Sequence, residues 1–346
     1  MKNLFICHTQ AHLILASGLA LGRFKDDEND LLLFVDFGIK DEMKERLDKT
    51  FTRTLYLQSI YPAEMNTAKA KLKWYPQDWK LIKQFLKEPA DRVFAVCDWL
   101  LLVQKTLQRA YKLNNQTEMA WLEDGITAYY SDSEIHGGMD KYSFTMAIRR
   151  FLFRDLVGVG KFYDRDFSLM GGLSCLKKVY TCNPDAVREP YRSQKQLVDI
   201  TDEEYLAGLS AMYPKSKLDV QQNSVILVVD KLDRYAFPDK VRTSLSAFIS
   251  KCKDEGKTVI CKFHPRETEV WDIFDGCQTM DKSVGIESAY VSLADIKDSI
   301  TIAGVKSAGL MSAKKLGYNT VSLFPSCGEK NENLVKFYEK LGIILI

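Results

Sequence analysis

The chain lacks a strong excess of charge of either sign, since 48 lysine and arginine residues stand against 46 aspartate and glutamate residues. This balance gives no overall field that would favour nucleic acid as a partner. The eight cysteines include no C-x-x-C pair, and most lie in apolar segments, such as Cys7, Cys97 and Cys261. We therefore expect buried thiols in a reducing compartment, with neither a zinc site nor a disulfide framework.

The sequence also lacks internal repeats and low-complexity tracts. Its apolar stretch at residues 11–22 is too short to span a bilayer. Only Lys2 precedes this stretch, although Ser17-Gly18-Leu19-Ala20 imitates the cleavage site of a signal peptide. We expect instead a buried first strand that runs into a helix.

Short apolar runs, typical of strands buried on both faces of a sheet, alternate with helical periodicity along the chain. The length of 346 residues suggests about two domains. We expect an α/β protein with two Rossmann-like domains, residues 1–160 and 196–346, joined by a crossover at 161–195 and facing across a cleft. A pair of domains of the periplasmic-binding type fits the same pattern. The clearest expected strands are 3–7, 31–35, 92–97, 119–122, 224–229 and 258–263.

An acidic motif, Glu123-Asp124-Gly125, closes the expected strand 119–122. Two adjacent carboxylates repel, which raises one pKa toward the range of a general base, and the glycine permits a sharp turn. Ligands of parallel sheets bind beyond the carboxyl ends of the strands, where Thr9 and Gln10 follow the first strand. The motif is therefore a candidate base, and we expect Thr9 and Gln10 to contact the substrate at the same edge of the sheet. On spacing alone a solvated turn or a helix N-cap is the more common explanation, because acidic turn residues are frequent.

A second motif, His264-Pro265, follows the strand 258–263. Pro265 fixes the turn, and His264 at the strand end could stabilise a phosphate, with positive charge from Lys262 beside it. Ser307 precedes a helix, where it could cap the helix or help its N-terminus to bind an anion. The alternative for His264 is a structural role at the strand end.

Two metal-like patterns carry little weight. Asp164 and Asp166 form a D-x-D pair in the crossover, and His8 and His12 have i, i+4 spacing without a nearby carboxylate or cysteine in sequence. We expect no metal site.

Basic residues accompany aromatic ones in two stretches, a pattern that fits docking on anionic lipid or an ordinary solvated face. The first surrounds Trp74 and Trp79, and the second adjoins Phe151 and Phe153. The basic residues are Lys69, Lys71, Lys73, Lys80, Lys83 and Lys87 in the first stretch and Arg149, Arg150 and Arg154 in the second.

The acidic motif, His264-Pro265 and Ser307, in this order, resemble the three motifs of the bacterial sialyltransferases, which have a GT-B fold of two Rossmann-like domains. The length and the segment Cys7-His8-Thr9-Gln10 are most similar to glycosyltransferase family 52, which contains lipooligosaccharide and capsule sialyltransferases. One departure is Ala308, which stands where the family motif has a second Ser or Thr.

The resemblance implies an inverting, metal-independent enzyme that uses CMP-sialic acid, needs no cofactor, and acts on a galactose-type acceptor of a bacterial surface glycan. It assigns the base to Glu123 or Asp124, with Gly125 beside it. On the donor side it assigns His264 and Ser307 to the phosphate and Glu287 to the ribose, with Lys262 and Pro265 beside them.

The first domain would then be the acceptor side and the second the donor side. A CMP-Kdo transferase, a polysialic acid polymerase and a non-catalytic two-lobed sugar-binding protein are the alternatives. We expect a bacterial cytoplasmic location, with peripheral contact to the inner membrane and a homodimer both left open.

Overall fold

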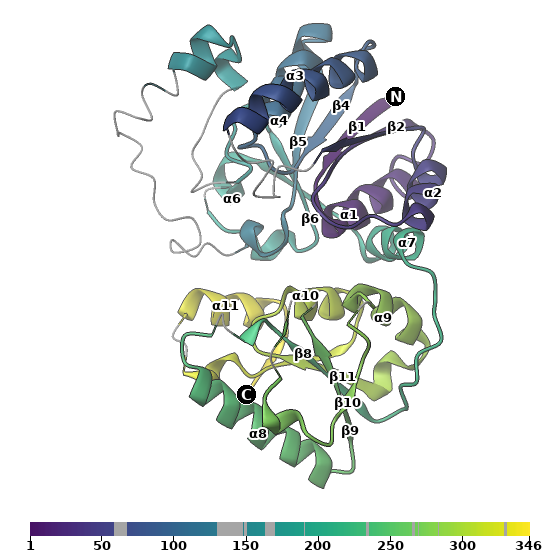
Figure 1. Cartoon of the computed structure of the whole chain (residues 1–346), viewed down its shortest axis with the longest axis vertical. Coiled ribbons are helices and arrows are strands. Elements are labelled where there is room, and N and C mark those ends of the chain that lie inside the picture. The colour runs from purple at the N-terminus through teal and green to yellow at the C-terminus, as the bar shows by residue number, and fades with distance from the viewer. Residues whose placement is uncertain are drawn as a thin grey trace. The chain divides into compact units, whose positions relative to one another are not determined.

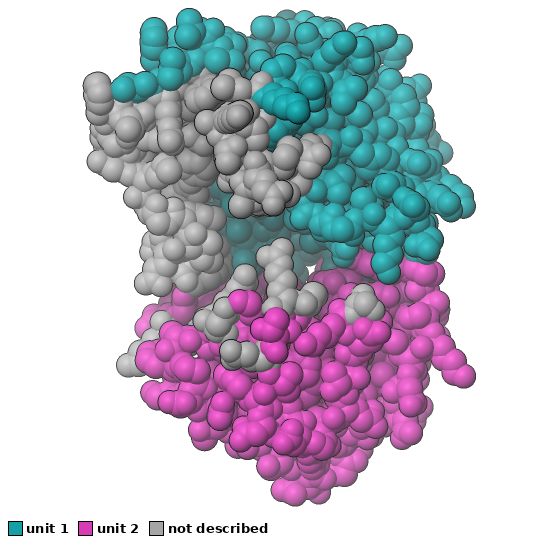
Figure 2. Space-filling model, in the orientation of Figure 1, with its two compact units in different colours: residues 1–212 teal, residues 213–346 magenta. Residues whose placement is uncertain are grey.

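The computed structural model describes two compact units, Met1–Met212 and Tyr213–Ile346, each with a parallel sheet flanked by helices (Figure 1; Figure 2). Below they are called unit 1 and unit 2. The described residues are 1–58, 68–129, 148, 151–162, 170–189, 191–232, 235–264, 267–268, 270–282, 284–328 and 331–346.

Unit 1 has a seven-stranded parallel sheet in the order β3-β2-β1-β4-β5-β6-β7. The order reverses between β1 and β4, which makes the space beyond their carboxyl ends the expected ligand position. The central strands are almost fully buried, as expected for a sheet covered on both faces. The strands are β1 (Lys2–Cys7), β2 (Glu28–Val35), β3 (Arg53–Gln58), β4 (Arg92–Ala95), β5 (Glu118–Leu122), β6 (Lys178–Thr181) and β7 (Gln196–Asp199).

The first helix of unit 1, α1 (Gln10–Leu21), is buried from His12 to Ala20, which explains its apolar sequence. It lies against α7 (Asp202–Met212) so closely that a Cβ on Gly208 would be 1.9 Å from the carbonyl oxygen of Ile14. Only glycine permits this backbone approach. The other helices are α2 (Asp41–Thr50), α3 (Ala68–Phe85), α4 (Leu101–Leu113) and α6 (Tyr191–Gln194).

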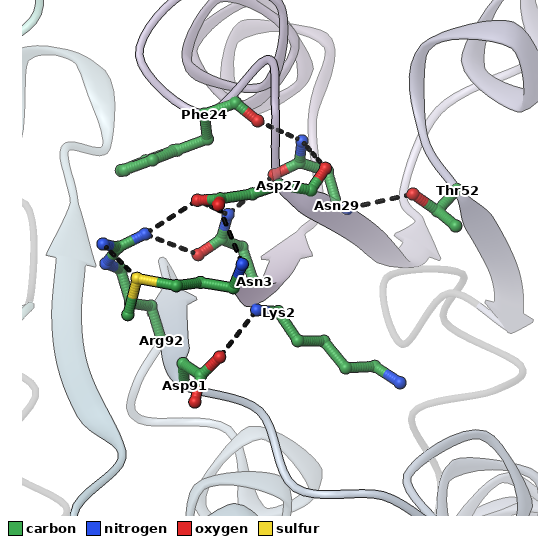
Figure 3. A network of polar contacts seen from close by, with 9 residues as sticks. Lys2, Asn3, Phe24, Asp27, Asn29, Thr52, Asp91 and Arg92 are labelled. Atoms are coloured by element: carbon green, nitrogen blue, oxygen red, sulfur yellow. Dashed lines mark hydrogen bonds and ion pairs between the residues drawn. The ribbon is translucent and has the colours of Figure 1, made fainter.

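The amino ends of the unit 1 strands are closed by a polar network (Figure 3). Asn3 is fully buried, and its Nδ2 donates to Asn29 Oδ1 at 2.9 Å and to Asp27 Oδ2 at 3.2 Å. Arg92 Nη1 donates to Asn3 Oδ1 at 3.2 Å and to Asp27 Oδ2 at 3.0 Å. These groups satisfy one another, so this end of the sheet is structural.

Unit 2 has a six-stranded parallel sheet in the order β10-β9-β8-β11-β12-β13, with its reversal between β8 and β11. Its strands are β8 (Ser224–Val229), β9 (Thr258–Phe263), β10 (Gln278–Thr279), β11 (Ile300–Gly304), β12 (Asn319–Ser322) and β13 (Ile344–Leu345). Its main helices are α8 (Pro238–Asp254), α9 (Ile286–Leu293), α10 (Ala308–Lys315) and α11 (Glu332–Lys340).

The structure corrects the expected domain boundary. The segment 161–195, expected to be a crossover, contains β6, which pairs with β5 through Ala120↔Lys178 and Trp121↔Val179. Residues 196–212 also belong to unit 1, because β7 pairs with β6 and α7 packs on α1. Gly171, within the segment 161–195, has φ +75° and packs against the ring of Trp121. Among the described residues, no helix is both long and apolar enough to cross a membrane.

Candidate functional site

The carboxyl end of the unit 1 sheet carries what we call the acidic cluster: His8, His12, Asp36, Glu123 and Asp124. These residues follow β1, β2 and β5, apart from His12, which lies in the first turn of α1. The fold thus places the acidic motif beside histidines that are more than 100 positions away in the sequence.

Glu123 points into the protein and is 4% exposed. Its Oε2 accepts hydrogen bonds from the hydroxyl of Tyr129, from Thr181 Oγ1 at 2.8 Å and from the backbone N–H of Cys182 at 2.9 Å. Burial raises the pKa of the Glu123 carboxyl, and these donors oppose the rise. This carboxylate therefore ties the turn after β5 to the turn after β6.

Asp124 has the opposite environment, since 26% of its side chain is exposed. Its Oδ1 lies 2.9 Å from Nε2 of His12, a residue that is only 1% exposed. The backbone N–H groups of His8 and Thr9 both donate to His12 Nδ1 at 3.2 Å. Because Nδ1 is thereby an acceptor, the ring proton lies on Nε2 and is donated to Asp124.

The turn that presents Asp124 is built by the next residues. Gly125 has φ +50°, a conformation that favours glycine, and it opens the short 3-10 helix Gly125–Ala128. Thr127 Oγ1 donates to the carbonyl of Asp124 at 2.7 Å. Gly125 therefore shapes the turn through its backbone.

A second histidine–carboxylate pair lies beside the first. His8 Nδ1 is 3.1 Å from Asp36 Oδ2, and the His8 ring stacks on Phe34 with centroids 4.7 Å apart. Burial lowers the pKa of His8, so the neutral ring donates its Nδ1 proton to Asp36. His8 Nε2 is buried and has no hydrogen-bond partner among the described residues.

His8 and His12 have no carboxylate near them in the sequence, and the fold supplies one for each. Among the described residues, no group of three or more histidine, cysteine or acidic side chains is arranged to hold a metal ion. Asp164 and Asp166 lie outside the described residues. The i, i+4 histidine spacing therefore serves two separate hydrogen-bonded pairs.

Thr9 and Gln10 lie where expected, at the carboxyl end of β1 beside the reversal of strand order, and Thr9 is half-buried. Thr9 caps α1, because its Oγ1 accepts from the backbone N–H of His12 at 3.4 Å. Its backbone N–H also donates to His12 Nδ1, so the observed contacts of Thr9 hold the first turn of α1 and the His12 ring.

In unit 2, His264 follows β9, and its backbone N–H donates to the carbonyl of Val229 at 3.0 Å, which extends the pairing with β8. Its neighbour Lys262 is 3% exposed and points inward. Lys262 Nζ donates to the carbonyls of Phe263 at 3.3 Å and Lys282 at 3.2 Å. Burial lowers the pKa of the Lys262 ammonium group. Its two hydrogen bonds link the end of β9 to the backbone of Lys282. Pro265 lies outside the described residues.

Ser307 is the N-cap of α10, where its Oγ accepts from the backbone N–H of Gly309 at 3.3 Å. Asp230, at the end of β8, accepts from the backbone N–H of Lys306 and from the hydroxyl of Tyr235, both at 3.2 Å, and is also hydrogen-bonded to Ser307. Burial raises the pKa of Asp230. Asp230 was not predicted from the sequence, although it follows an apolar strand as Glu123 and Asp124 do.

Glu287 lies in the first turn of α9, and burial raises the pKa of its carboxyl while the charge of Lys262 opposes the rise. The starts of α9 and α10 adjoin, because a Cβ on Gly309 would lie 3.4 Å from Ile286 Cγ2. The predicted residues of unit 2 that the structure describes lie at the carboxyl end of β9 and at the starts of α9 and α10, and β9 and β11 both neighbour β8 in the sheet. A helix start, a histidine and two carboxyl groups can hold an anion and a polyhydroxylated ring.

Two units of this kind, each with a parallel sheet and a reversal of strand order, define an α/β protein of the GT-B type. Solved structures agree in fold. The GT-B domain of a sialyltransferase from Photobacterium damselae is 13% identical, with a TM-score of 0.55 over 99% of this chain and 97% of that one. A putative UDP-N-acetylglucosamine 2-epimerase from Listeria monocytogenes is 14% identical, with a TM-score of 0.56 over 98% and 87%. The glycosyltransferase of kitacinnamycin is 12% identical, with a TM-score of 0.54 over 100% and 86%.

The family is shown by sequence. Residues 3–322 match the model of the alpha-2,8-polysialyltransferase (POLYST) family, and the chain belongs to this family. No curated protein matches the chain. The predictions of a GT-B fold, of a glycosyltransferase and of a bacterial sialyltransferase are confirmed. Within the sialyltransferases, the matching family is that of the polysialyltransferases, whereas the sequence motifs had indicated family 52.

Proposed function

We propose that the protein transfers sialic acid from CMP-sialic acid to a bacterial surface glycan, with inversion and without a metal ion. The observation that carries the proposal is the pair of His12 and Asp124, a partly exposed carboxylate held by a buried ring at the reversal of strand order. Asp124 is the general base, and Glu123 anchors the turn that presents it.

The reaction needs one proton acceptor and one stabilised leaving group. The acceptor hydroxyl loses its proton to Asp124 while its oxygen bonds to the anomeric carbon, and the bond from that carbon to the phosphate oxygen breaks. The transition state resembles an oxocarbenium ion, as in glycoside cleavage. CMP leaves with the electron pair, so attack from the opposite face inverts the configuration.

Unit 2 supplies the donor side of this proposal. His264 and the start of α10 at Ser307 stabilise the charge that develops on the CMP phosphate, and Glu287 binds the ribose. Lys262 contributes indirectly, because its hydrogen bonds to the carbonyls of Phe263 and Lys282 support the backbone next to His264. Phosphate binding at Ser307 requires the Ser307 hydroxyl to exchange its bond with Asp230 for one with the donor.

Two acceptors are compatible with this chemistry. The resemblance to glycosyltransferase family 52 implies a galactose-type end, as in lipooligosaccharide, and the family match favours a sialic acid end that is extended by α-2,8 linkages. A galactose acceptor would gain one residue, whereas a sialic acid acceptor would give a ladder of products.

The test is incubation with CMP-sialic acid and either a lactoside or an oligosialic acid primer, with and without EDTA, followed by mass spectrometry. We expect sialylated product and CMP in both the presence and the absence of EDTA. Release of CMP only from CMP-Kdo would replace the proposed donor. Loss of activity with EDTA, restored by magnesium or manganese, would contradict metal independence.

Docking at the inner face of the cytoplasmic membrane is a separate proposal, and its support is charge alone. Lys73, Lys80 and Lys83 are exposed along α3, whereas Trp74 is buried in unit 1. The ring of Trp79 makes a cation–π contact with the ammonium of Lys105, which lies 4.7 Å from the ring centroid. Anionic lipid would thus meet lysines without an aromatic anchor.

The other residues of the two basic stretches give less support to the proposal of membrane docking. Phe151 and Arg154 are exposed, and Arg154 lies 3.8 Å from Asp155. The side chains of Lys69, Lys71 and Phe153 and the residues Arg149 and Arg150 lie outside the described part of the chain. A homodimer stays open.

A further inference from the structure

We infer that His12 is a positioning residue for catalysis, which holds Asp124 by donating its Nε2 proton to the carboxylate while the backbone of residues 8 and 9 fixes its tautomer. The inference rests on the proposed function, in which Asp124 is the base. It assigns a catalytic purpose to the turn between β1 and α1, which the three sialyltransferase motifs leave out.

The geometry limits the His12 ring to one arrangement. Both backbone nitrogens that lie 3.2 Å from Nδ1 are N–H donors, so a proton on Nδ1 would point at two other protons. The His12 ring is almost fully buried, and the backbone N–H of His12 is hydrogen-bonded to Thr9 Oγ1. The side chain therefore cannot turn Nδ1 toward Asp124 without losing the hydrogen bonds that Nδ1 accepts. Nε2–H therefore remains the only ring donor available to Asp124.

The peptide that fixes His12 is itself held from the neighbouring strand. His8, whose N–H is one of the two donors, bonds Asp36 at the end of β2 and stacks on Phe34. The support thus runs from β2 through His8 to His12 and on to Asp124. Such layered support keeps a reacting group within the narrow geometry that catalysis requires.

The bond to His12 has two consequences for the base. It holds the Asp124 carboxylate in one rotamer, and it stabilises the ionised form, which is the form that accepts a proton. Other titratable groups within electrostatic reach of Asp124 are His8, Cys97 and Tyr191. All three are present in every variant below, so a change between variants reports His12.

Two substitutions separate positioning from a purely structural role. In His12→Gln the amide nitrogen takes the place of Nε2 and can still donate to Asp124, but the backbone N–H groups lose their acceptor. In His12→Asn the amide oxygen takes the place of Nδ1 and can accept from the backbone, but the donor to Asp124 is lost. Each variant therefore keeps one half of the histidine's hydrogen bonds.

We expect His12→Asn to melt near the wild-type temperature and to lose kcat by about 10-fold to 100-fold, as when a supporting partner of a reacting group is removed. Its KM for CMP-sialic acid should be unchanged, and the acidic limb of its pH profile of kcat/KM should move to higher pH. His12→Gln should keep kcat within a few-fold of wild type and melt earlier. The reverse pattern, with His12→Asn active and His12→Gln inactive, would overturn the inference.

A measurement without turnover keeps this test separate from the proposed function. In the wild-type protein, ¹⁵N–¹H correlation of the histidine side chains should show His12 protonated at Nε2, with a resonance that shifts in Asp124→Asn. A proton on Nδ1 would overturn the inference whatever the enzyme's substrate. If wild type shows this tautomer but transfers no sialic acid, the proposed function alone fails.

Discussion

The two units differ in whether the hydrogen bonds of their candidate residues would have to change before the proposed reaction. In unit 1 the Nε2–H of His12 already donates to Asp124, and two backbone N–H donors to Nδ1 fix this arrangement. In unit 2 the carboxyl group of Asp230 is hydrogen-bonded to Lys306 and Ser307 at the start of α10, which is the proposed phosphate site. The proposed base is thus held in place already, whereas phosphate binding at the proposed site would require Ser307 to exchange hydrogen-bond partners.

Loss of His264 is expected to give the largest effect among the tests of this contrast. His264→Ala should weaken transition-state stabilisation by roughly 2–4 kcal/mol, as does loss of one preorganised donor. The control is Lys262→Met, which keeps the volume of the buried side chain. We expect this control to lower Tm more than it lowers kcat/KM. Steady-state kinetics and thermal unfolding of both variants check this, and a CMP-bound structure with the nucleotide far from His264 and Ser307 would refute the assignment.

Asp230 should make donor binding depend on pH. Burial raises its pKa, so with rising pH the carboxyl ionises later than an ordinary aspartate and then repels the CMP phosphate. The Kd of CMP should therefore increase as pH rises through this raised pKa, by about 10-fold if the repulsion is near 1.4 kcal/mol. Asp230→Asn should flatten the profile in calorimetric titrations of CMP. An unchanged profile in this variant would show that Asp230 does not face the phosphate.

Glu123 should affect stability more than turnover. Its folded pKa is raised, so the native state binds more protons than the unfolded state above about pH 4.5. The contribution of Glu123 to the free energy of unfolding is fully present below its pKa in the unfolded chain. It is lost as pH rises through its pKa in the folded protein, and it amounts to about 1.4 kcal/mol for each pH unit that separates the two pKa values. Urea unfolding at several pH values should show a steeper loss of stability with rising pH in wild type than in Glu123→Gln, because Asp230 and Glu287 contribute slopes of the same sign in both proteins. The same slope in both proteins would remove Glu123 as its cause.

Comparison of the sequence with the structure shows which features local patterns can predict. The apolar runs of β1, β2, β8 and β9 were predicted, because a strand buried on both faces needs a continuous apolar sequence. The short β6 lies in the segment 161–195, which was expected to be a crossover. Its membership in the unit 1 sheet depends on pairing with β5 across more than 50 residues, and no local signal carries that pairing.

The candidate site divides in the same way. Glu123, Asp124, His264 and Ser307 stand out because each closes a strand or opens a helix. The difference between Glu123 and Asp124 could not be predicted, since it arises from Thr181 and Cys182 on one side and from His12 on the other. Such partners are set by strand order, which brings β1, β5 and β6 into one sheet.

Charge on α3 is expected to give the smallest effect. Reversal of Lys73, Lys80 and Lys83 to glutamate should weaken sedimentation with anionic vesicles by about 1 kcal/mol per residue, with less effect in high salt. Activity on a soluble acceptor should stay unchanged, because these residues lie outside the acidic cluster. Equal sedimentation of wild type and variant would leave the lysines as an ordinary solvated face.

The role of Asp124 can be tested most directly with a nucleophile that needs no base. In Asp124→Ala, transfer to a hydroxyl acceptor should fall by about 10²-fold or more, with donor binding little changed. Azide carries no proton to remove, so its addition should restore CMP release from CMP-sialic acid and give a sialyl azide of inverted configuration. Glu123→Gln should transfer to the normal acceptor without azide. Normal transfer by Asp124→Ala, or a retained configuration of the azide product, would contradict the assignment of Asp124 as the base.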